Sequence, residues 1–168
     1  MFKKIMLAAL VAAPMCLMAQ TAKFGVVNSQ EIFNVMPEKA TAENTLKTAS
    51  DRYEAEYKNL QEAFQKKLTD YEALEKDPST TDAIKQRHQE ELQTEYQKIQ
   101  NFQQTAAQDL QKQQDTLLAP ISQKLQNAIQ AVGAEGGYAG ILDAATLLYK
   151  GNNIEDVSAK VKAKLGIK

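Results

Sequence analysis

The sequence predicts a mostly α-helical fold with a small β body, in which a long antiparallel helical hairpin is attached to a few short strands. No glycine occurs between Gly25 and Gly133, and glycine and proline are the residues that destabilise a helix most. Residues 77–80, Asp-Pro-Ser-Thr, interrupt this stretch where a hairpin of helices needs its turn. Short apolar runs on both sides of the stretch are typical of strands. The middle of the chain is therefore expected to run out as one helix and return as another.

Residues 1–19 have the pattern of a Sec signal peptide. Two lysines precede an apolar run that starts at Ile5, and Ala19 offers a small residue at the cleavage site. A retained membrane anchor is the alternative, but Pro14 breaks the apolar stretch. The only cysteine, Cys16, lies in this segment, so the exported protein is expected to contain no disulfide.

Charge and histidine content argue against several classes of function. Removal of residues 1–19 leaves 18 of the 20 basic side chains against 21 acidic ones, which gives no electrostatic reason to expect nucleic acid as a partner. His88 is the only histidine, and no carboxylate or cysteine pattern near it has the spacing of a metal site. A single imidazole does not supply a Ser-His-Asp or Cys-His catalytic set. The sequence also has no glycine-rich loop that could bind the phosphates of a nucleotide. We expect no enzyme, no metal and no cofactor.

The first helix of the hairpin is expected to begin at Pro37, because a proline in the first turn loses no hydrogen bond. Its apolar residues recur at steps of three or four that average 3.5, which is the spacing of a coiled-coil seam. They are Leu46, Ala49, Tyr53, Tyr57, Leu60, Phe64, Leu68, Tyr71 and Leu74.

The tip of the hairpin is expected at residues 77–81, with Ser79 as the N-cap of the returning helix. That helix repeats its apolar positions every eleven residues, at Ile99, Leu110, Ile121 and Val132. Because this spacing differs from 3.5, we expect the two helices to pack tightly over only part of their length. Pro120 falls inside the returning helix and predicts a kink, since the apolar spacing continues beyond it. The arm thus spans residues 37–132.

Antiparallel pairing about this tip places Val35 beside Ser122 and brings both ends of the chain together. Residues 23–36 and 133–168 are therefore expected to form one β-rich oligomerisation body. Its predicted strands are Phe24–Val27, Tyr138–Leu142 and Thr146–Tyr149. A C-terminal helix capped by Asn153 is expected to follow, with an apolar face made of Ile154, Val157, Val161 and Leu165.

Three short strands and one short helix bury too little surface to be stable alone, and they expose strand edges. We expect other copies of the chain to complete the body as an intersubunit β-barrel, which removes the edges. The number of copies does not follow from this argument. The interface is expected to use the apolar residues of the strands: Phe24, Val26, Ile141, Leu142, Leu147 and Tyr149.

The order of these elements resembles the Skp/OmpH family of periplasmic chaperones for outer-membrane proteins. The likeness runs through the whole mature chain and rests on residues 23–33, 137–143, 148–149 and 154–161, together with the signal peptide and the helical pair. The resemblance implies a homotrimer in the periplasm of a Gram-negative type of envelope. Its strands would form a central barrel from which three arms surround a cavity. An unfolded outer-membrane protein would be held in that cavity without ATP.

One departure from the family concerns the tip of the arm. Residues 66–91 carry five basic and seven acidic side chains, whereas well-known members have positive tips. Binding of lipopolysaccharide or of anionic membrane is therefore not expected to carry over.

Aromatic side chains along the arm are the candidate client-binding groups, because exposed rings can hold many different unfolded chains weakly. The candidates are Tyr53, Tyr57, Phe64, Tyr71, Tyr96 and Phe102. The alternative is that these rings only join the two helices of the arm, in which case a ring must lie outside the seam to touch a client. The rival function is an exported coiled-coil structural or adaptor protein of the envelope, although residues 77–81 show no apolar docking residue.

Overall fold

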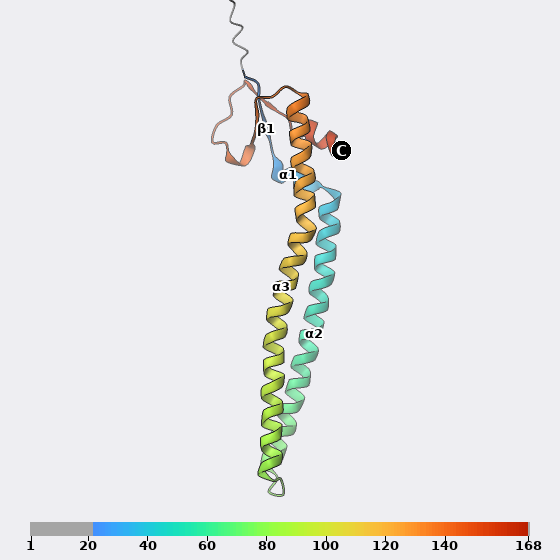
Figure 1. The fold of residues 1–168 in the computed structure, drawn as a ribbon, viewed down its shortest axis with the longest axis vertical. Coiled ribbons are helices and arrows are strands. Elements are labelled where there is room, and N and C mark those ends of the chain that lie inside the picture. The colour runs from blue at the N-terminus through green and yellow to red at the C-terminus, as the bar shows by residue number, and fades with distance from the viewer. Residues whose placement is uncertain (1–21, 168) are drawn as a thin grey trace, which may run out of the picture.

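The computed structural model describes residues 22–167 and consists of a long helical hairpin with a small mixed body at one end (Figure 1). The elements in chain order are strand β1 (Phe24–Val27), helices α1 (Ser29–Val35), α2 (Pro37–Lys76) and α3 (Asp82–Glu135), strand β2 (Gly140–Asp143), a 3₁₀ turn (Ala144–Thr146), strand β3 (Ile154–Asp156) and helix α4 (Ser158–Lys164). Figure 1 shows α2 and α3 side by side along the whole arm, as predicted. The predicted signal peptide lies outside the described residues.

Helix α2 begins at Pro37, which confirms the predicted start. The short helix α1 precedes it and is capped by Asn28, whose side chain accepts a hydrogen bond from the backbone N–H of Glu31. Between the two helices Met36 adopts an extended backbone conformation and is 1% exposed. The chain therefore turns from the body into the arm at Met36, and the buried methionine anchors this corner.

The tip of the arm differs from the prediction at its cap. The Asp77 carboxylate accepts hydrogen bonds from the backbone N–H of Ser79, at 2.8 Å, and from the Ser79 hydroxyl, at 2.7 Å. Because Ser79 is held in this turn, α3 begins only at Asp82, with Thr81 at the N-cap position. The predicted N-cap at Ser79 is wrong: its hydroxyl donates backward to Asp77 instead of accepting from the next helix.

Helix α3 continues through Pro120 to Glu135, as the apolar spacing predicts. The loss of one backbone donor is tolerated because α3 packs against the core on both sides of Pro120, through partly buried Leu117 before it and through buried residues after it. Ile121, Leu125, Ala128 and Val132 are all at most 6% exposed. A helix end at Pro120 is thereby excluded.

The three strands form one parallel sheet in the order β2-β1-β3. The predicted strands around Phe24 and Ile141 are confirmed, but the prediction of a third strand at Thr146–Tyr149 is wrong. A parallel neighbour on the far edge of β1 requires a connection that crosses the sheet, and residues 144–153 form that connection. The third strand is therefore Ile154–Asp156.

The C-terminal helix is correspondingly shorter than predicted. It begins at Ser158, whose backbone N–H donates to the carboxylate of Asp156. Asn153 lies in the connection and does not cap it. Ile154, predicted on the apolar face of this helix, instead pairs in the sheet with Phe24, whereas Val157 and Val161 are fully buried.

The hydrophobic core lies where the body meets the arm. It joins residues of β1, α1, α2, α3 and α4, namely Val27, Ile32, Met36, Ala42, Ile121, Leu125, Ala128, Val132, Val157 and Val161. Further along the arm, the buried apolar residues of the described chain are Leu60, Ile99 and Ala106. The base of the arm is therefore the best-packed region, and the distal arm is held by a narrow seam.

Candidate functional site

The predicted functional residues lie on two surfaces of the molecule. One is the length of the arm, which carries the aromatic side chains, and the other is the sheet of the body. On the arm, rings from the two helices meet in pairs. The Tyr53 and Phe102 rings lie 6.0 Å apart in an edge-on arrangement, and the Phe64 and Tyr96 rings lie 6.3 Å apart. Four of the six predicted rings therefore contribute to the contact between α2 and α3.

Tyr96 differs from the other rings in its exposure. Its side chain is 52% exposed, whereas the other five candidates are half-buried. The Tyr96 hydroxyl accepts a hydrogen bond of 2.7 Å from the side-chain amide of Gln100, one turn further along α3. The ring is thus held at the edge of the seam, with one side paired to Phe64 and the other side open.

Tyr57 and Tyr71 are bound to their own helix. The side-chain amide of Gln61 donates to the Tyr57 hydroxyl, and the Tyr71 hydroxyl donates to the carboxylate of Glu75. Each bond spans four residues on α2. Neither ring makes an aromatic pair within the described chain.

Polar bridges between the helices fix their register. The Tyr53 hydroxyl donates to the Asp109 carboxylate, which also accepts from Gln113. These bonds lower the pKa of Asp109 and raise that of Tyr53.

A second bridge lies nearer the tip, where Lys67 Nζ is 2.9 Å from Glu95 Oε1. The hydrogen bond lowers the pKa of Glu95 and raises that of Lys67. A one-turn slip of α2 against α3 would break both bridges, so together with the ring pairs they set the alignment of the arm.

On the body, the two faces of the sheet have different environments. Gly25 and Ile141 are register partners and face the helices: a Cβ atom on Gly25 would lie 3.2 Å from Val157 and 3.3 Å from Ile141. Ile141 packs against the hydrophobic core of its own subunit. The opposite face carries Phe24, Val26 and Leu142.

This opposite face is apolar and only partly covered. Phe24 is 41% exposed and Leu142 is 40% exposed, whereas Val26 is 3% exposed and Leu147 is half-buried. The connection between β2 and β3 carries two further exposed apolar side chains, Leu148 and Tyr149, which are 105% and 82% exposed. We call the exposed group Phe24, Leu142, Leu148 and Tyr149 the apolar sheet patch.

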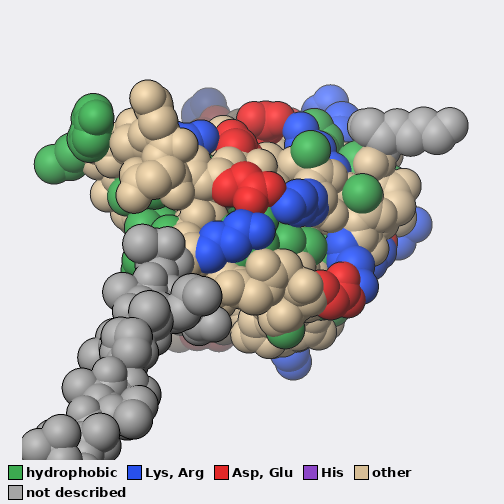
Figure 2. Space-filling view, turned by 90° about the horizontal axis from the view of Figure 1, so that it is seen from above, with side chains coloured by type: hydrophobic (Ala, Val, Ile, Leu, Met, Phe, Trp, Pro, Cys, Tyr) green, Lys and Arg blue, Asp and Glu red, His purple; other side chains and the backbone are tan. Residues whose placement is uncertain are grey.

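The end of the body has a different character. Figure 2 views it from above and shows basic and acidic side chains interleaved over its middle, with hydrophobic side chains scattered between them and the most protruding ones at one edge. Lys160 and Lys23 both bind the Glu155 carboxylate, with Nζ–O distances of 2.5 and 3.2 Å. With Lys160 as the largest cause, followed by Tyr138 and Lys23, the pKa of Glu155 falls to about 2. These ion pairs join the residue before β1 to β3 and α4.

Two kinds of site are absent from the described part of the chain. Residues 22–167 hold no group of three or more His, Cys, Asp or Glu side chains arranged to bind a metal ion. Among the same residues, no helix is both long enough and apolar enough to cross a membrane.

The model of the family described as "Outer membrane protein (OmpH-like)" matches residues 23–165. The chain belongs to this OmpH-like family. Its relatives include the chaperone protein Skp of Salmonella typhimurium, which is 26% identical over 164 residues covering 95% of this chain and 96% of the relative. The chaperone protein Skp of Yersinia enterocolitica is 28% identical over 149 residues, covering 84% of this chain and 85% of the relative.

The OmpH-like fold is shared with a solved structure as well. A putative OmpH-like outer membrane chaperone from Caulobacter crescentus superposes with a TM-score of 0.74 at 17% identity, covering 86% of this chain and 83% of that one. This likeness concerns the fold, and it agrees with the hairpin and small sheet described above.

Sequence reasoning missed Leu148, the most exposed large apolar residue of the described OmpH-like chain. The prediction of a strand at Thr146–Tyr149 placed Leu147 and Tyr149 on one face and left Leu148 out of the predicted interface. The available signal was the run Leu147-Leu148-Tyr149 beside Gly151, because three consecutive apolar residues do not alternate as a half-buried strand requires.

Proposed function

We propose that this chain is a holdase chaperone that binds unfolded outer-membrane proteins between its arms and prevents their aggregation without ATP. The observation that carries the proposal is the match, over nearly the whole length, between this chain and relatives named chaperone protein Skp. The fold supports it, because the distal arm has only a narrow seam and no enclosed core. A surface of this kind suits weak contacts with many clients.

The assembly belongs to the same proposal. The body, residues 23–36 and 133–168, forms a homotrimer whose strands close a β-barrel, and each subunit projects the arm of residues 37–132. The exposed edges of β2 and β3 and the apolar sheet patch support this, because both would be covered by neighbouring copies. The protein works in the periplasm after removal of residues 1–19.

Client contact along the arm is assigned first to Tyr96, whose ring is the most exposed of the six candidates. Tyr57 and Tyr71 contribute as half-buried rings, whereas Tyr53, Phe64 and Phe102 act mainly by joining α2 to α3. Many such contacts within one cavity add through their high effective concentration.

An aggregation assay tests the function. A urea-denatured outer-membrane barrel protein is diluted into buffer with or without the purified protein, and light scattering is followed. We expect one trimer per client to suppress most of the scattering in the absence of nucleotide. If an equimolar trimer leaves aggregation unchanged, the chain is better explained as a structural or adaptor protein of the envelope.

A further inference from the structure

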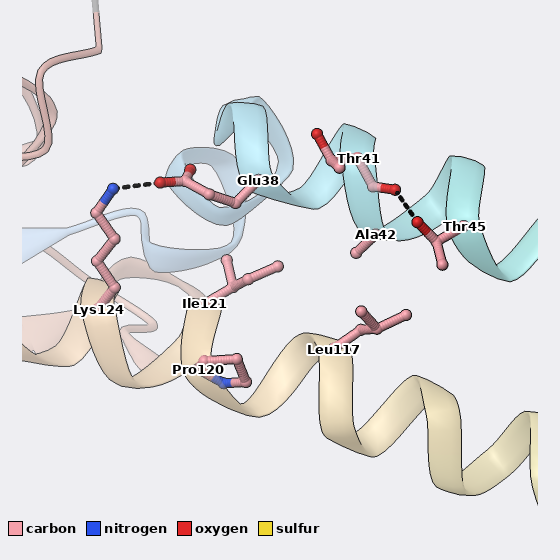
Figure 3. A pocket seen from close by; sticks show the side chains of 8 residues that line it. All are labelled: Glu38, Thr41, Ala42, Thr45, Leu117, Pro120, Ile121 and Lys124. Carbon is pink, nitrogen blue, oxygen red and sulfur yellow. Dashed lines mark hydrogen bonds and ion pairs between the residues drawn. The ribbon is translucent and has the colours of Figure 1, made fainter.

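A groove opens between α2 and α3 at the base of the arm, just below the body. Its volume is about 380 Å³, and its lining includes Ala42, Thr45, Leu117, Pro120 and Ile121 (Figure 3). Ala42 and Ile121 form its buried floor, with 4% and 5% exposure, whereas Thr45 and Pro120 are exposed at its rim. We call this feature the Pro120 groove.

The groove exists because α2 carries small side chains here. Further out, α2 fills the seam with Tyr53 and Phe64, whose rings reach across to α3. At the base the corresponding side chains are Ala42 and Thr45, which are too short to fill the space in front of Pro120. Within the described chain, this space is left open rather than packed.

The threonines at the rim are less polar than their residue type suggests. The Thr41 hydroxyl donates to the carbonyl oxygen of Pro37. The Thr45 hydroxyl donates to the carbonyl oxygen of Thr41 at 2.9 Å (Figure 3). With both hydroxyls turned to the backbone of their own helix, the methyl groups remain for contact. Most of the lining is therefore apolar and its hydroxyl groups are already bonded.

One end of the groove carries an ion pair. Lys124 Nζ binds Glu38 Oε1, and both side chains stay partly exposed, at 48% and 40% (Figure 3). This bond lowers the pKa of Glu38. Because the two charges neutralise each other, the groove offers neither a free cation nor a free anion to a charged ligand.

We propose that the Pro120 groove is a subsite for one bulky apolar side chain of an extended client segment. The apolar lining complements such a side chain. The Lys124 ammonium keeps donor hydrogens beyond its contact with Glu38, and they complement the C=O groups of the extended backbone beside the groove. This inference rests on the proposed function, because it names which client feature the base of the arm recognises.

Strands of outer-membrane barrels fit this requirement. They alternate apolar and polar residues and are about ten residues long, so an unfolded strand presents an isolated apolar side chain at every second position. A groove that accepts one such side chain binds many sequences weakly, as a holdase requires.

A photo-crosslinking peptide tests the subsite. The peptide has about nine residues of alternating serine and valine, with p-benzoylphenylalanine at its centre. The full-length assembled protein is irradiated with the peptide, and cross-links are mapped by mass spectrometry. We expect cross-links on the residues that line the groove, with Thr45 and Leu117 among them.

Two groove-filling variants and a matched control sharpen the test. Thr45→Leu and Thr41→Leu each place a larger side chain at the rim of the groove. We expect either variant to lower the cross-link yield about fivefold, because the side chain of the peptide then buries less apolar surface in the groove. Thr48→Leu is the control: Thr48 also lies exposed on α2 with its hydroxyl bonded four residues back, to Asn44, but it does not line the groove. Circular dichroism checks that all three variants remain helical.

The outcomes separate this inference from the proposed function. The subsite is wrong if the cross-link yield is equal in Thr45→Leu, Thr41→Leu and Thr48→Leu, or if the cross-links lie only on residues outside the groove. The proposed function still stands in that case, provided that the unmodified protein suppresses client aggregation. Failure of the unmodified protein to suppress aggregation removes the proposed function instead. If one groove variant fails to fold, the other carries the comparison.

Discussion

At the scale of single residues, neighbouring rings on the arm have different roles. Phe64 and Tyr96 form one pair, yet Phe64 is half-buried while Tyr96 is 52% exposed. The buried residue of this part of α3 is Ile99, three positions beyond Tyr96. The Tyr96 ring therefore lies at the edge of the seam, where it contacts Phe64 with one side and remains open on the other.

Tyr96→Ser is expected to weaken client binding about two- to threefold and to lower the thermal midpoint of the arm less than loss of Phe64 does, because the Tyr96 side chain is mostly exposed. Client affinity is measured by fluorescence titration and stability by circular dichroism. The contrasting variant is Phe64→Ser, which removes the inner ring of the same pair and should lower the thermal midpoint. If Tyr96→Ser binds clients as well as the unmodified chain, the assignment of Tyr96 is wrong.

At the scale of elements, α2 and α3 are joined by few apolar contacts and several polar ones. The carboxylates of Asp109, Glu95 and Glu38 each bind a side chain of the other helix, namely Tyr53, Lys67 and Lys124. All three carboxyl groups have a lowered pKa because of these bonds. The stability of the arm is therefore expected to depend on pH.

The sign of this dependence follows from proton binding. A carboxyl group with a lowered pKa in the folded state contributes stability above its unfolded pKa, near 4, and loses it as the pH falls through the folded value. We expect the thermal midpoint of the arm, followed by helical circular dichroism, to be constant from neutral pH to about 5 and to fall below about 4. The effect is modest because the groups are partly solvated.

Tyr53→Phe provides the control for this prediction. It removes the hydrogen bond that is the largest cause of the lowered pKa of Asp109, so this variant should be less stable at neutral pH and should lose less stability in acid. An arm equally stable at pH 3 and pH 7 would contradict the role of these bridges.

At the scale of the whole molecule, the body is the part that needs partners. Its sheet has three strands of three or four residues with two free edges in the described chain. Phe24 and Leu142 of the apolar sheet patch lie on the face of the sheet that points away from the helices. Ile141, by contrast, packs against the core of its own subunit, so a charge at Ile141 would disturb folding and assembly together.

Assembly is therefore tested at Leu148 and Tyr149, which are almost fully exposed in the single chain. The double variant Leu148→Asp, Tyr149→Asp should leave the helical content unchanged and raise the dissociation constant of the oligomer at least tenfold, because an interface would bury the new charges. Sedimentation velocity measures this. Asn152→Asp, which adds a charge at an exposed position of the same connection, should assemble normally, and a double variant that also assembles normally would place the interface elsewhere.

The helical hairpin could be predicted from the sequence because its causes are local. The absence of glycine, the start at Pro37, the turn after Lys76 and the repeating apolar positions each act within a few residues of the backbone they shape. The family followed from the order of these elements and a few short motifs. Individual aromatic positions were also identifiable, since tyrosine and phenylalanine stand out against the glutamine-rich arm.

Only the tertiary structure decided the sheet, the caps and the exposure of each ring. Ile154, Val157 and Val161 have the spacing of a helical face, yet Ile154 pairs with β1 because hydrogen bonding to a distant strand outweighs a short local preference. Ser79 is a residue type that often caps a helix, but its hydroxyl instead donates a hydrogen bond to the carboxylate of Asp77. Likewise, the sequence left open whether the Tyr96 ring joins the two helices or faces solvent. The Pro120 groove arises only because small side chains on α2 lie opposite a proline far along α3. Such outcomes depend on contacts between residues distant in the sequence, whereas the hairpin depends on neighbours.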